Sequence, residues 1–302
     1  MSFVAMLLII VSAVTHAAWN FLGKRERPSS SLFLIATIMG GLVMLPVVAW
    51  FHDCYPLIPP AVLGWVALTG LFQAVYFGML AAAYRAGDMS LAYPLARSVP
   101  TLLVTAVALL MGTAGAISNL CLAGIVLVIA GCSILPIGQF RAIKLASYLN
   151  ACCCFALIAA IGTAGYMVID KHALGRLCTL PGAPFSKVDA ALIYAPLEIL
   201  STAFWLSLYV AFNSGERRCF AQILRGAKSQ ALVMGLGIYG AYTLVLVAMN
   251  FTTHVSYIMA FRQMSIPLGA SLGIFALKEP SPLPKTVGVA TVFAGVVLVG
   301  LG

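Results

Sequence analysis

Residues 61–84 (AVLGWVALTGLFQAVYFGMLAAAY) form an apolar run of 24 residues without a single Asp, Glu, Lys or Arg. A membrane-spanning helix needs about 20 such residues, so this run is long enough to cross the hydrocarbon layer. The whole chain has the same character, since 62% of its 302 residues are hydrophobic, 8% are charged and the mean hydropathy is +1.05. Soluble domains carry roughly 25% charged residues. The composition therefore excludes a soluble globular enzyme and a disordered chain, and it predicts an integral membrane protein.

Similar apolar runs recur along the chain, separated by short polar or Pro/Gly-rich breaks. We expect every run to be helical, because in lipid each backbone polar group must find its partner within the segment. The ten predicted spans are residues 2–22, 31–51, 61–84, 89–111, 118–137, 148–169, 190–212, 230–250, 255–277 and 283–301. The longest predicted loops, 170–189 and 213–229, are too short for a second, water-soluble domain.

The net charge of +9 arises largely from short basic clusters between the runs. Such clusters determine membrane topology, so the charge does not indicate nucleic-acid binding. Loops after the odd-numbered spans hold 12 Lys and Arg residues, whereas loops after the even-numbered spans hold 3. This asymmetry predicts that the odd loops lie in the cytoplasm and both termini outside. Because no basic segment precedes the first run, we expect a retained span rather than a cleaved signal peptide.

The second half of the chain repeats features of the first half in the same order. The matching pairs are His16–Lys24 with Thr163–Lys171, Gln73 and Tyr76 with Tyr239 and Tyr242, and Arg97–Pro100 with Met264–Pro267. Because each half holds an odd number of spans, the second copy enters the membrane upside down. We therefore expect an all-α bundle of ten transmembrane helices built as two inverted five-helix repeats, residues 1–147 and 148–302. Secondary transporters use this plan, with the substrate site near the bilayer midplane.

Two stretches carry a family resemblance. They are residues 82–100 (AAYRAGDMSLAYPLARSVP) and the C-terminal stretch from Pro267 to Pro280, followed by Gly288 and Gly295. Together with the His16–Lys24 segment, they resemble the ten-span, EamA-like branch of the drug/metabolite transporter (DMT) superfamily. The resemblance implies a secondary carrier, in many relatives an exporter of amino acids or other small metabolites. It also implies a cavity lined by spans 1, 3, 4, 6, 8 and 9. The glutamate of the pattern, Glu279, occurs in the second repeat only.

Three charged residues fall deep inside predicted spans: Arg97, Glu198 and Arg262. A charge at the bilayer centre costs at least about 2.5–3.5 kcal/mol on insertion scales, so each is expected to be paired, hydrated or functional. Arg97 and Arg262 enter from opposite faces and reach a similar depth, so we expect both to bind a carboxylate or phosphonate group of the substrate. Glu198 either pairs with Arg262 in the empty site or carries a coupling proton. A fixed Glu198–Arg262 ion pair, with Arg97 extending to the interface, is the alternative.

Aromatic and polar side chains at matching positions of the two halves form the rest of the predicted substrate site. Their rings provide apolar contact, and their polar groups can orient a solute. These predicted substrate-binding residues are His16, Trp19, Gln73, Tyr76, Tyr93, Tyr166, Tyr239 and Tyr242. Each ring alone can equally fill the bundle core, and His16 is either a proton relay or a hydrogen-bond partner of a neighbouring helix.

Three prolines fall inside predicted spans 4 and 9, namely Pro94, Pro100 and Pro267. Proline removes a backbone donor and bends a helix, so these residues are expected to act as gating hinges or as passive kinks.

The sequence predicts a multi-pass protein of the cell (inner) membrane that transports, and in particular exports, a small organic metabolite such as an amino acid or a related carboxylate or phosphonate. Its expected partners are this small-molecule substrate, the lipid bilayer and protons, with no nucleic acid, and its expected state is a monomer or homodimer. Because the chain has no nucleotide-binding or H-E-x-x-H motif and its four histidines are dispersed, we expect neither an enzyme nor a cofactor or metal.

Two other functions stay open. One is a proton-coupled exporter of cationic drugs, for which Glu198 would be the midplane carboxylate that such chemistry needs. The other is a membrane sensor or assembly protein that transports nothing.

Overall fold

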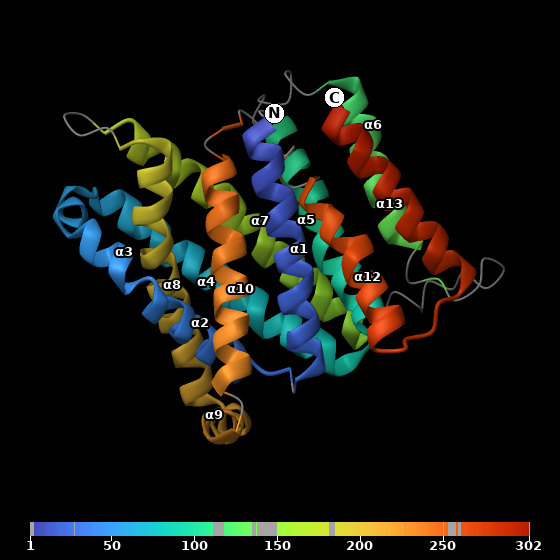
Figure 1. The fold of residues 1–302 in the computed structure, drawn as a ribbon, viewed down its shortest axis with the longest axis horizontal. Helices are drawn as coiled ribbons and strands as arrows, with labels where there is room; N and C mark the ends of the chain where they lie inside the picture. Colours follow the sequence, from blue (N-terminus) through green and yellow to red (C-terminus); the bar gives the residue numbers. More distant parts are fainter. Residues whose placement is uncertain are drawn as a thin grey trace.

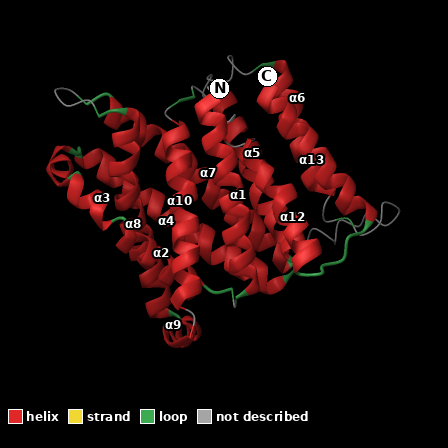
Figure 2. Ribbon diagram, in the orientation of Figure 1, coloured by secondary structure: helices red, strands yellow, loops and turns green. Residues whose placement is uncertain are grey.

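The chain folds into a bundle of helices in the computed structural model, as the sequence predicts (Figures 1 and 2). The structure describes residues 3–26, 28–110, 118–134, 137, 150–180, 185–226, 228–249, 251–252, 258 and 261–301, and no strand occurs among them. The α-helices are α1 (Phe3–Arg25), α2 (Ser30–Val43), α3 (Leu45–Trp50), α4 (Pro60–Ala86), α5 (Met89–Leu110), α6 (Asn119–Ile134), α7 (Ala151–Cys178), α8 (Lys187–Phe212), α9 (Ser214–Gly226), α10 (Lys228–Met249), α12 (Ser265–Ala276) and α13 (Leu283–Leu301). Two 3-10 helices, η1 (His52–Leu57) and η5 (Arg262–Met264), complete the described elements.

Five helices of the described chain are long and apolar enough to cross a membrane: α1, α4, α7, α8 and α10. The outward face of α1 shows why a lipid environment suits the fold. Phe3, Leu7, Val11 and Val14 recur at helical spacing and are 74%, 52%, 48% and 53% exposed. A stripe of this kind would be unfavourable in water, whereas acyl chains cover it at no cost. The structure thus indicates a multi-pass membrane protein.

Each predicted span overlaps an observed helix, but three boundaries differ. Predicted span 31–51 is divided at Met44 into α2 and α3, because Pro46 has no N–H to continue the ladder of hydrogen bonds. The predicted loop 213–229 is wrong, since it contains the helix α9. The predicted loop 170–189 is wrong in its first part, since α7 continues to Cys178.

Helix α7 continues past the predicted boundary because its charged residues have partners inside the protein. In the sequence alone, these residues indicate a polar break between spans. Asp170 is fully buried and accepts hydrogen bonds from other helices. The Nζ of Lys171 donates to the carbonyls of Met249 and Thr252, at 2.7 and 3.0 Å. Both charges therefore find partners within the protein, so the helix does not have to end where they begin.

Several helices begin at a polar side chain that accepts a hydrogen bond from the first turn. The Oγ of Ser29 accepts from the N–H of Leu32 at the start of α2, at 3.1 Å. The Oδ1 of Asn150 accepts from the N–H of Cys153 at the start of α7, at 2.9 Å. Such N-caps satisfy donors that the helix itself leaves unpaired.

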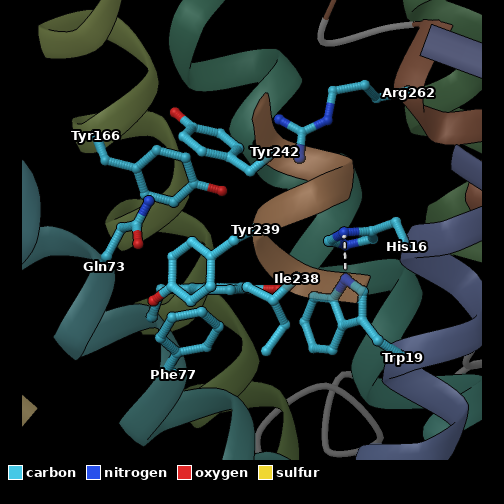
Figure 3. A pocket seen from close by; sticks show the side chains of 10 residues that line it. His16, Trp19, Gln73, Phe77, Tyr166, Ile238, Tyr239, Tyr242 and Arg262 are labelled. Carbon is cyan, nitrogen blue, oxygen red and sulfur yellow. Dashed lines mark hydrogen bonds between the residues drawn. The ribbon is translucent and has the colours of Figure 1, made fainter. Parts of the chain in front are cut away.

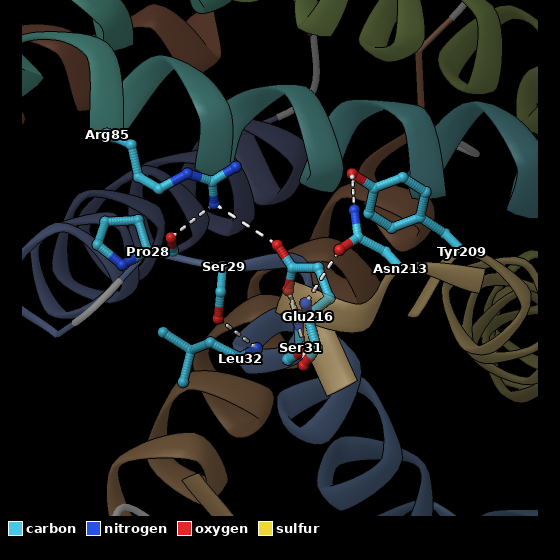
Figure 4. Close-up of polar contacts among 8 residues, drawn as sticks. All are labelled: Pro28, Ser29, Ser31, Leu32, Arg85, Tyr209, Asn213 and Glu216. Carbon is cyan, nitrogen blue, oxygen red and sulfur yellow. Dashed lines mark hydrogen bonds and ion pairs between the residues drawn. The ribbon is translucent and has the colours of Figure 1, made fainter. Parts of the chain in front are cut away.

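The short helix α9 lies across one end of the bundle, opposite the ends of α1 and α13 where the chain starts and finishes (Figure 1). Glu216 connects it to the first turn of α2, accepting hydrogen bonds from the N–H and the Oγ of Ser31, both at 2.9 Å (Figure 4). The Nη1 of Arg85 at the end of α4 lies 3.7 Å from the Oε1 of Glu216 and donates to the carbonyl of Pro28 at 2.8 Å. These contacts join the end of α4 to the starts of α2 and α9.

The bundle is organised around α1, α4, α7 and α10, which meet at its centre. Helix α4 packs against α7 and α8, and α1 packs against α10 and α12. Helix α2 packs against α8 and α10, and α5 packs against α7. Helices α6 and α13 form a pair at one edge (Figure 1).

Glycines permit the closest helix contacts. A Cβ added at Gly235 of α10 would lie 2.2 Å from the carbonyl oxygen of Ala36 in α2, and one at Gly131 of α6 would lie 2.7 Å from the amide nitrogen of Val292 in α13. Small residues at helix crossings are a usual feature of membrane bundles, because association there depends on close van der Waals contact.

We expect Gly235→Ala to destabilise the protein by about 1–3 kcal/mol, the usual cost of overpacking. The added methyl group would have to push α10 away from α2. Thermal unfolding of the purified protein in detergent measures the effect. Gly240→Ala is the matched control on the same helix, since its Cβ meets nothing within 4 Å. Equal unfolding temperatures for the two variants would contradict this description of the α2–α10 contact.

Candidate functional site

A small cavity of about 20 Å³, enough for about one water molecule, lies at the centre of the bundle (Figure 3). Helices α1, α4, α7 and α10 and the 3-10 helix η5 contribute its walls. The lining residues are His16, Trp19, Gln73, Tyr76, Phe77, Tyr166, Ile238, Tyr239, Tyr242 and Arg262. Those from the four long helices come from near the middle of each helix, so the cavity is far from both ends of the bundle.

Most of the predicted substrate-binding residues meet at this cavity. Eight of them line it: His16, Trp19, Gln73, Tyr76, Tyr166, Tyr239, Tyr242 and Arg262. Phe77 and Ile238 line it too, but an apolar side chain in an apolar span carries no signal that distinguishes it from core. Of the predicted set, Arg97 and Tyr93 are not among the lining residues. Tyr93 is buried on α5, with its ring 6.1 Å from the ring of His16.

Aromatic rings form much of the wall. Tyr166 packs edge-to-face against Tyr242, with ring centroids 5.4 Å apart, and Tyr76 lies 6.1 Å from Tyr166. The hydroxyl of Tyr239 donates to the Oγ1 of Thr37, at 2.9 Å, so it is held by α2. Edge-to-face packing favours rings in fixed positions, which gives the cavity a defined shape.

His16 lies beside the cavity with one nitrogen engaged. Its Nδ1 accepts a hydrogen bond from the Nε1 of Trp19, at 3.1 Å (Figure 3). The indole N–H is only a donor, so Nδ1 must be unprotonated and the proton of the neutral ring sits on Nε2. Within the described part of the chain Nε2 has no hydrogen-bond partner, although His16 is only 5% exposed. The ring therefore keeps one donor for a ligand, and its protein partner is on its own helix rather than on a neighbouring one.

Arg262 is the one charged residue among those lining the cavity, and it is 3% exposed. Its Nη1 contacts the Sδ of Met167 at 3.1 Å, and its Cζ lies 5.8 Å from the ring centroid of Tyr242. A thioether and a ring face do not neutralise a guanidinium. No carboxylate of the described chain lies within ion-pair distance of Arg262. An anion is the missing partner that such a group would bind most strongly.

Arg97 occupies a different place from the one that the sequence predicts. It is 2% exposed, and its Nη2 donates to the carbonyl of Arg262 at 3.3 Å and contacts the Oγ of Ser265 at 3.5 Å. In the opposite direction, the Nε2 of Gln263 donates to the carbonyl of Arg97. Arg97 thus holds η5, and with it Arg262, against α5. Of the two guanidinium groups, only that of Arg262 is among the residues that line the cavity.

The prolines have different local effects. Pro94 and Pro100 lie within the continuous helix α5, whereas Pro267 lies in the first turn of α12, directly after η5. Residues 255–257, 259 and 260 of predicted span 9 lie outside the described residues. The carbonyl of Arg262 at this break accepts from the Oγ of Ser265, at 2.9 Å, as well as from Arg97. The backbone N–H of Ser265 donates to the same carbonyl, so the side-chain hydrogen bonds add to the 3-10 bond there.

Glu198 does not pair with Arg262. It is 1% exposed on α8, and its Oε1 accepts a hydrogen bond from the Nε2 of Gln73. The Oε1 of Gln73 accepts in turn from the Oγ1 of Thr202, at 3.1 Å. The predicted Glu198–Arg262 ion pair is thus wrong, because the carboxylate of Glu198 accepts a hydrogen bond from the side-chain amide of Gln73 on α4 instead.

Asp170 is the buried group that the sequence analysis missed, since it was assigned to a loop. Its Oδ1 accepts from the Oγ1 of Thr69, at 2.7 Å, and from the hydroxyl of Tyr194, at 2.8 Å. Its Oδ2 accepts from the hydroxyl of Tyr242, a residue of the cavity wall. One signal could have found it: Asp170 follows Tyr166 by four residues, which places both on the same face of a continued helix.

Among the described residues no cluster of three or more His, Cys, Asp or Glu side chains could hold a metal ion. The site instead combines one buried donor on His16 that has no partner in the described chain, one unpaired guanidinium and a wall of rings. That combination suits a small organic solute with an anionic group and an apolar body.

Comparison with known proteins shows the fold. No protein-family model matches the chain, and no curated protein sequence is similar to it. Twenty-four chains of solved structures are similar. One, described only as "Crystal structure of protein", superposes with a TM-score of 0.63 at 18% sequence identity and covers 99% of this chain and 94% of its own. The shared arrangement of helices therefore extends over nearly the full length of both chains.

We expect Tyr242→Phe to lower the stability of the protein by about 1.5–3 kcal/mol, the usual worth of a hydrogen bond to a charged group. The change removes one of the three hydroxyl donors of Asp170 and leaves the ring in place. Thermal unfolding in detergent measures it. Tyr209→Phe, at a 45% exposed tyrosine, is the control and should have little effect. A Tyr242→Phe protein as stable as the control would refute the assignment of this hydroxyl to Asp170.

Proposed function

We propose that this chain is a secondary transporter of the DMT superfamily, EamA-like, which moves a small organic solute bearing a carboxylate or phosphonate group across the cell membrane by alternating access. The observation that carries the proposal is the buried, unpaired guanidinium of Arg262 in a central cavity. A charged residue at this depth is expensive, so its retention points to a substrate path.

The packing of the helices supports ten spans in two inverted repeats. The repeats pair α1 with α7, α2 with α8, α4 with α10, α5 with η5 and α12, and α6 with α13. If each helix is replaced by its counterpart in the other repeat, every contact should correspond to another observed contact. The α1–α10 contact corresponds to α7–α4, the α2–α10 contact to α8–α4, and the α5–α7 contact to α12–α1, and all of them are observed. The α6–α13 and α2–α8 contacts convert into themselves. A duplicated, inverted unit accounts for this correspondence directly.

The two lysines that align between the halves make equivalent contacts at opposite ends of the bundle. The Nζ of Lys24 donates to the carbonyls of Tyr84 and Gly87 at the end of α4, both at 2.9 Å. Lys171 makes the corresponding contacts at the end of α10, the counterpart of α4. Lysine at a helix C-terminus satisfies free carbonyls and interacts favourably with the helix dipole. The same function at both positions supports a common origin of the halves.

The competing substrate class, cationic drugs, is disfavoured by the charge of the cavity wall. Arg262 would repel a cation, and the two buried carboxylates lie behind Gln73 and Tyr242 rather than on the wall. An anionic or zwitterionic metabolite fits better, and export is the direction that the family resemblance favours.

A thermal-shift screen of the purified protein against amino acids, organophosphonates, nucleosides and cationic dyes tests the proposal. We expect stabilisation by compounds with a carboxylate or phosphonate group, and uptake of the same compounds into proteoliposomes. Stabilisation by cationic dyes alone would favour drug export, and binding without any transport would favour a membrane sensor.

Arg262→Ala should weaken binding of any carboxylate or phosphonate found in this screen by about 2–5 kcal/mol, because it removes the partner of a buried charge. Arg262→Lys should retain part of the affinity, since an ammonium keeps the charge but loses the planar fork of donors. Titration calorimetry measures both. Arg218→Ala, on the exposed side of α9, is the control. Unchanged affinity in Arg262→Ala would exclude this guanidinium from the binding site.

A further inference from the structure

Two carboxylates lie directly behind the cavity wall, and each is joined to the wall by one lining side chain. Gln73 donates to Glu198, and Tyr242 donates to Asp170 (Figure 3 shows both lining residues). Glu198 and Asp170 are 1% and 0% exposed. Neither forms an ion pair with a Lys, Arg or His of the described chain. Both are therefore held by neutral donors only, namely an amide and three hydroxyls.

Counted in their ordinary ionised forms, four charged side chains buried in the described chain balance one another. Arg97 and Arg262 are formally positive, and Asp170 and Glu198 are formally negative. His16 is neutral, because its Nδ1 accepts from Trp19. The two guanidinium groups and the two carboxylates form no ion pairs with one another, because the carboxylates accept hydrogen bonds from neutral donors instead.

An incoming monoanion changes this balance. It adds one negative charge to a region of low dielectric constant, where a net charge is strongly unfavourable. One proton taken from water by a carboxylate oxygen restores neutrality, with no covalent bond to the solute. The guanidinium groups cannot be the groups that titrate, because arginine stays protonated in proteins. Protonation of His16 would break the bond from Trp19 and add a third cation.

We propose that Asp170 and Glu198 act as a carboxylate pair that takes up one proton whenever a monoanionic solute binds in the cavity, so that anion and proton are transported together. This inference rests on the proposed transport function and names its coupling ion. Within the described chain, the charged and titratable groups that face the pair from the surrounding helices are Tyr166, Tyr194, Tyr239, Tyr242 and Arg262. Arg262 is the sole cation among them, and it faces the solute as well.

The sharpest test compares two probes of nearly equal size, propionate and β-alanine, on the purified full-length protein. Propionate is a monoanion, whereas β-alanine adds an ammonium and has no net charge. The dissociation constant for propionate should rise about tenfold per pH unit between about pH 5.5 and pH 8, since one linked proton gives that slope. The value for β-alanine should stay constant. A weakly buffered solution with a pH indicator should show one proton taken up per propionate bound.

Glu198→Gln and Asp170→Asn, made separately, should each abolish the pH slope for propionate and retain the strong binding seen at low pH, since one carboxylate is then permanently neutral. Asp53→Asn, at a side chain 88% exposed on η1, is the matched control and should keep the slope. If neither interior variant folds, the proton count on the unmodified protein still decides.

The outcomes separate the two proposals. Propionate binding without proton uptake and without a pH slope overturns the inference and leaves the transport proposal intact. The same slope for β-alanine as for propionate, or a slope that survives in both interior variants, also overturns it. If neither propionate nor β-alanine binds at any pH, the proton-linked binding of a small monoanion is refuted, while the ligand screen still decides the transport proposal.

Discussion

A guanidinium group buried in an apolar bundle needs either a counter-charge or a dense set of acceptors, and Arg262 has neither from the described chain. Much of the interior follows from this constraint. Its side chain is surrounded by polarisable groups, the Sδ of Met167 and the face of Tyr242, which are the weakest partners that still favour a cation. A small cavity, rather than a packed side chain, lies beside it. An interior built for stability alone would have filled that space with a hydrophobic side chain.

The position of Arg262 depends in turn on a break in regular helix. In η5 the carbonyl of Arg262 accepts a 3-10 hydrogen bond from the backbone N–H of Ser265, and it also accepts from the side chains of Arg97 and Ser265. Arg97 is thus a positioning residue, because its guanidinium donates to the backbone carbonyl of Arg262 and holds that residue in place. Because Gln263 returns a hydrogen bond to the carbonyl of Arg97, α5 and η5 are joined in both directions. Movement of one of these elements must carry the other with it.

The two buried carboxylates, Asp170 and Glu198, also lack a counter-charge among the described residues. Asp170 and Glu198 are surrounded by neutral donors that satisfy their oxygens without cancelling their charge. The interior therefore separates its positive and negative groups instead of pairing them, with Gln73 and Tyr242 standing between the carboxylates and the cavity. If the buried charges formed ion pairs, they would neutralise one another locally. Because they are kept apart, each can interact with a charged group that enters the cavity. This separation, more than any single residue, distinguishes the centre of the molecule from an ordinary bundle core.

The sequence by itself determined the helical fold and most of the cavity wall. Its apolar runs must be helical in lipid, and polar or aromatic residues stand out against that background, so residues such as His16, Gln73 and Tyr166 could be identified from their depth alone. Only the tertiary structure decided which way each charge points. Depth along a span says nothing about the direction in which a side chain faces, which is why Arg97 and Glu198 were given the wrong neighbours. A charge near the end of an apolar run fits a loop and a buried helical turn equally well, and Asp170 became a buried residue because hydroxyl groups of three other helices surround it.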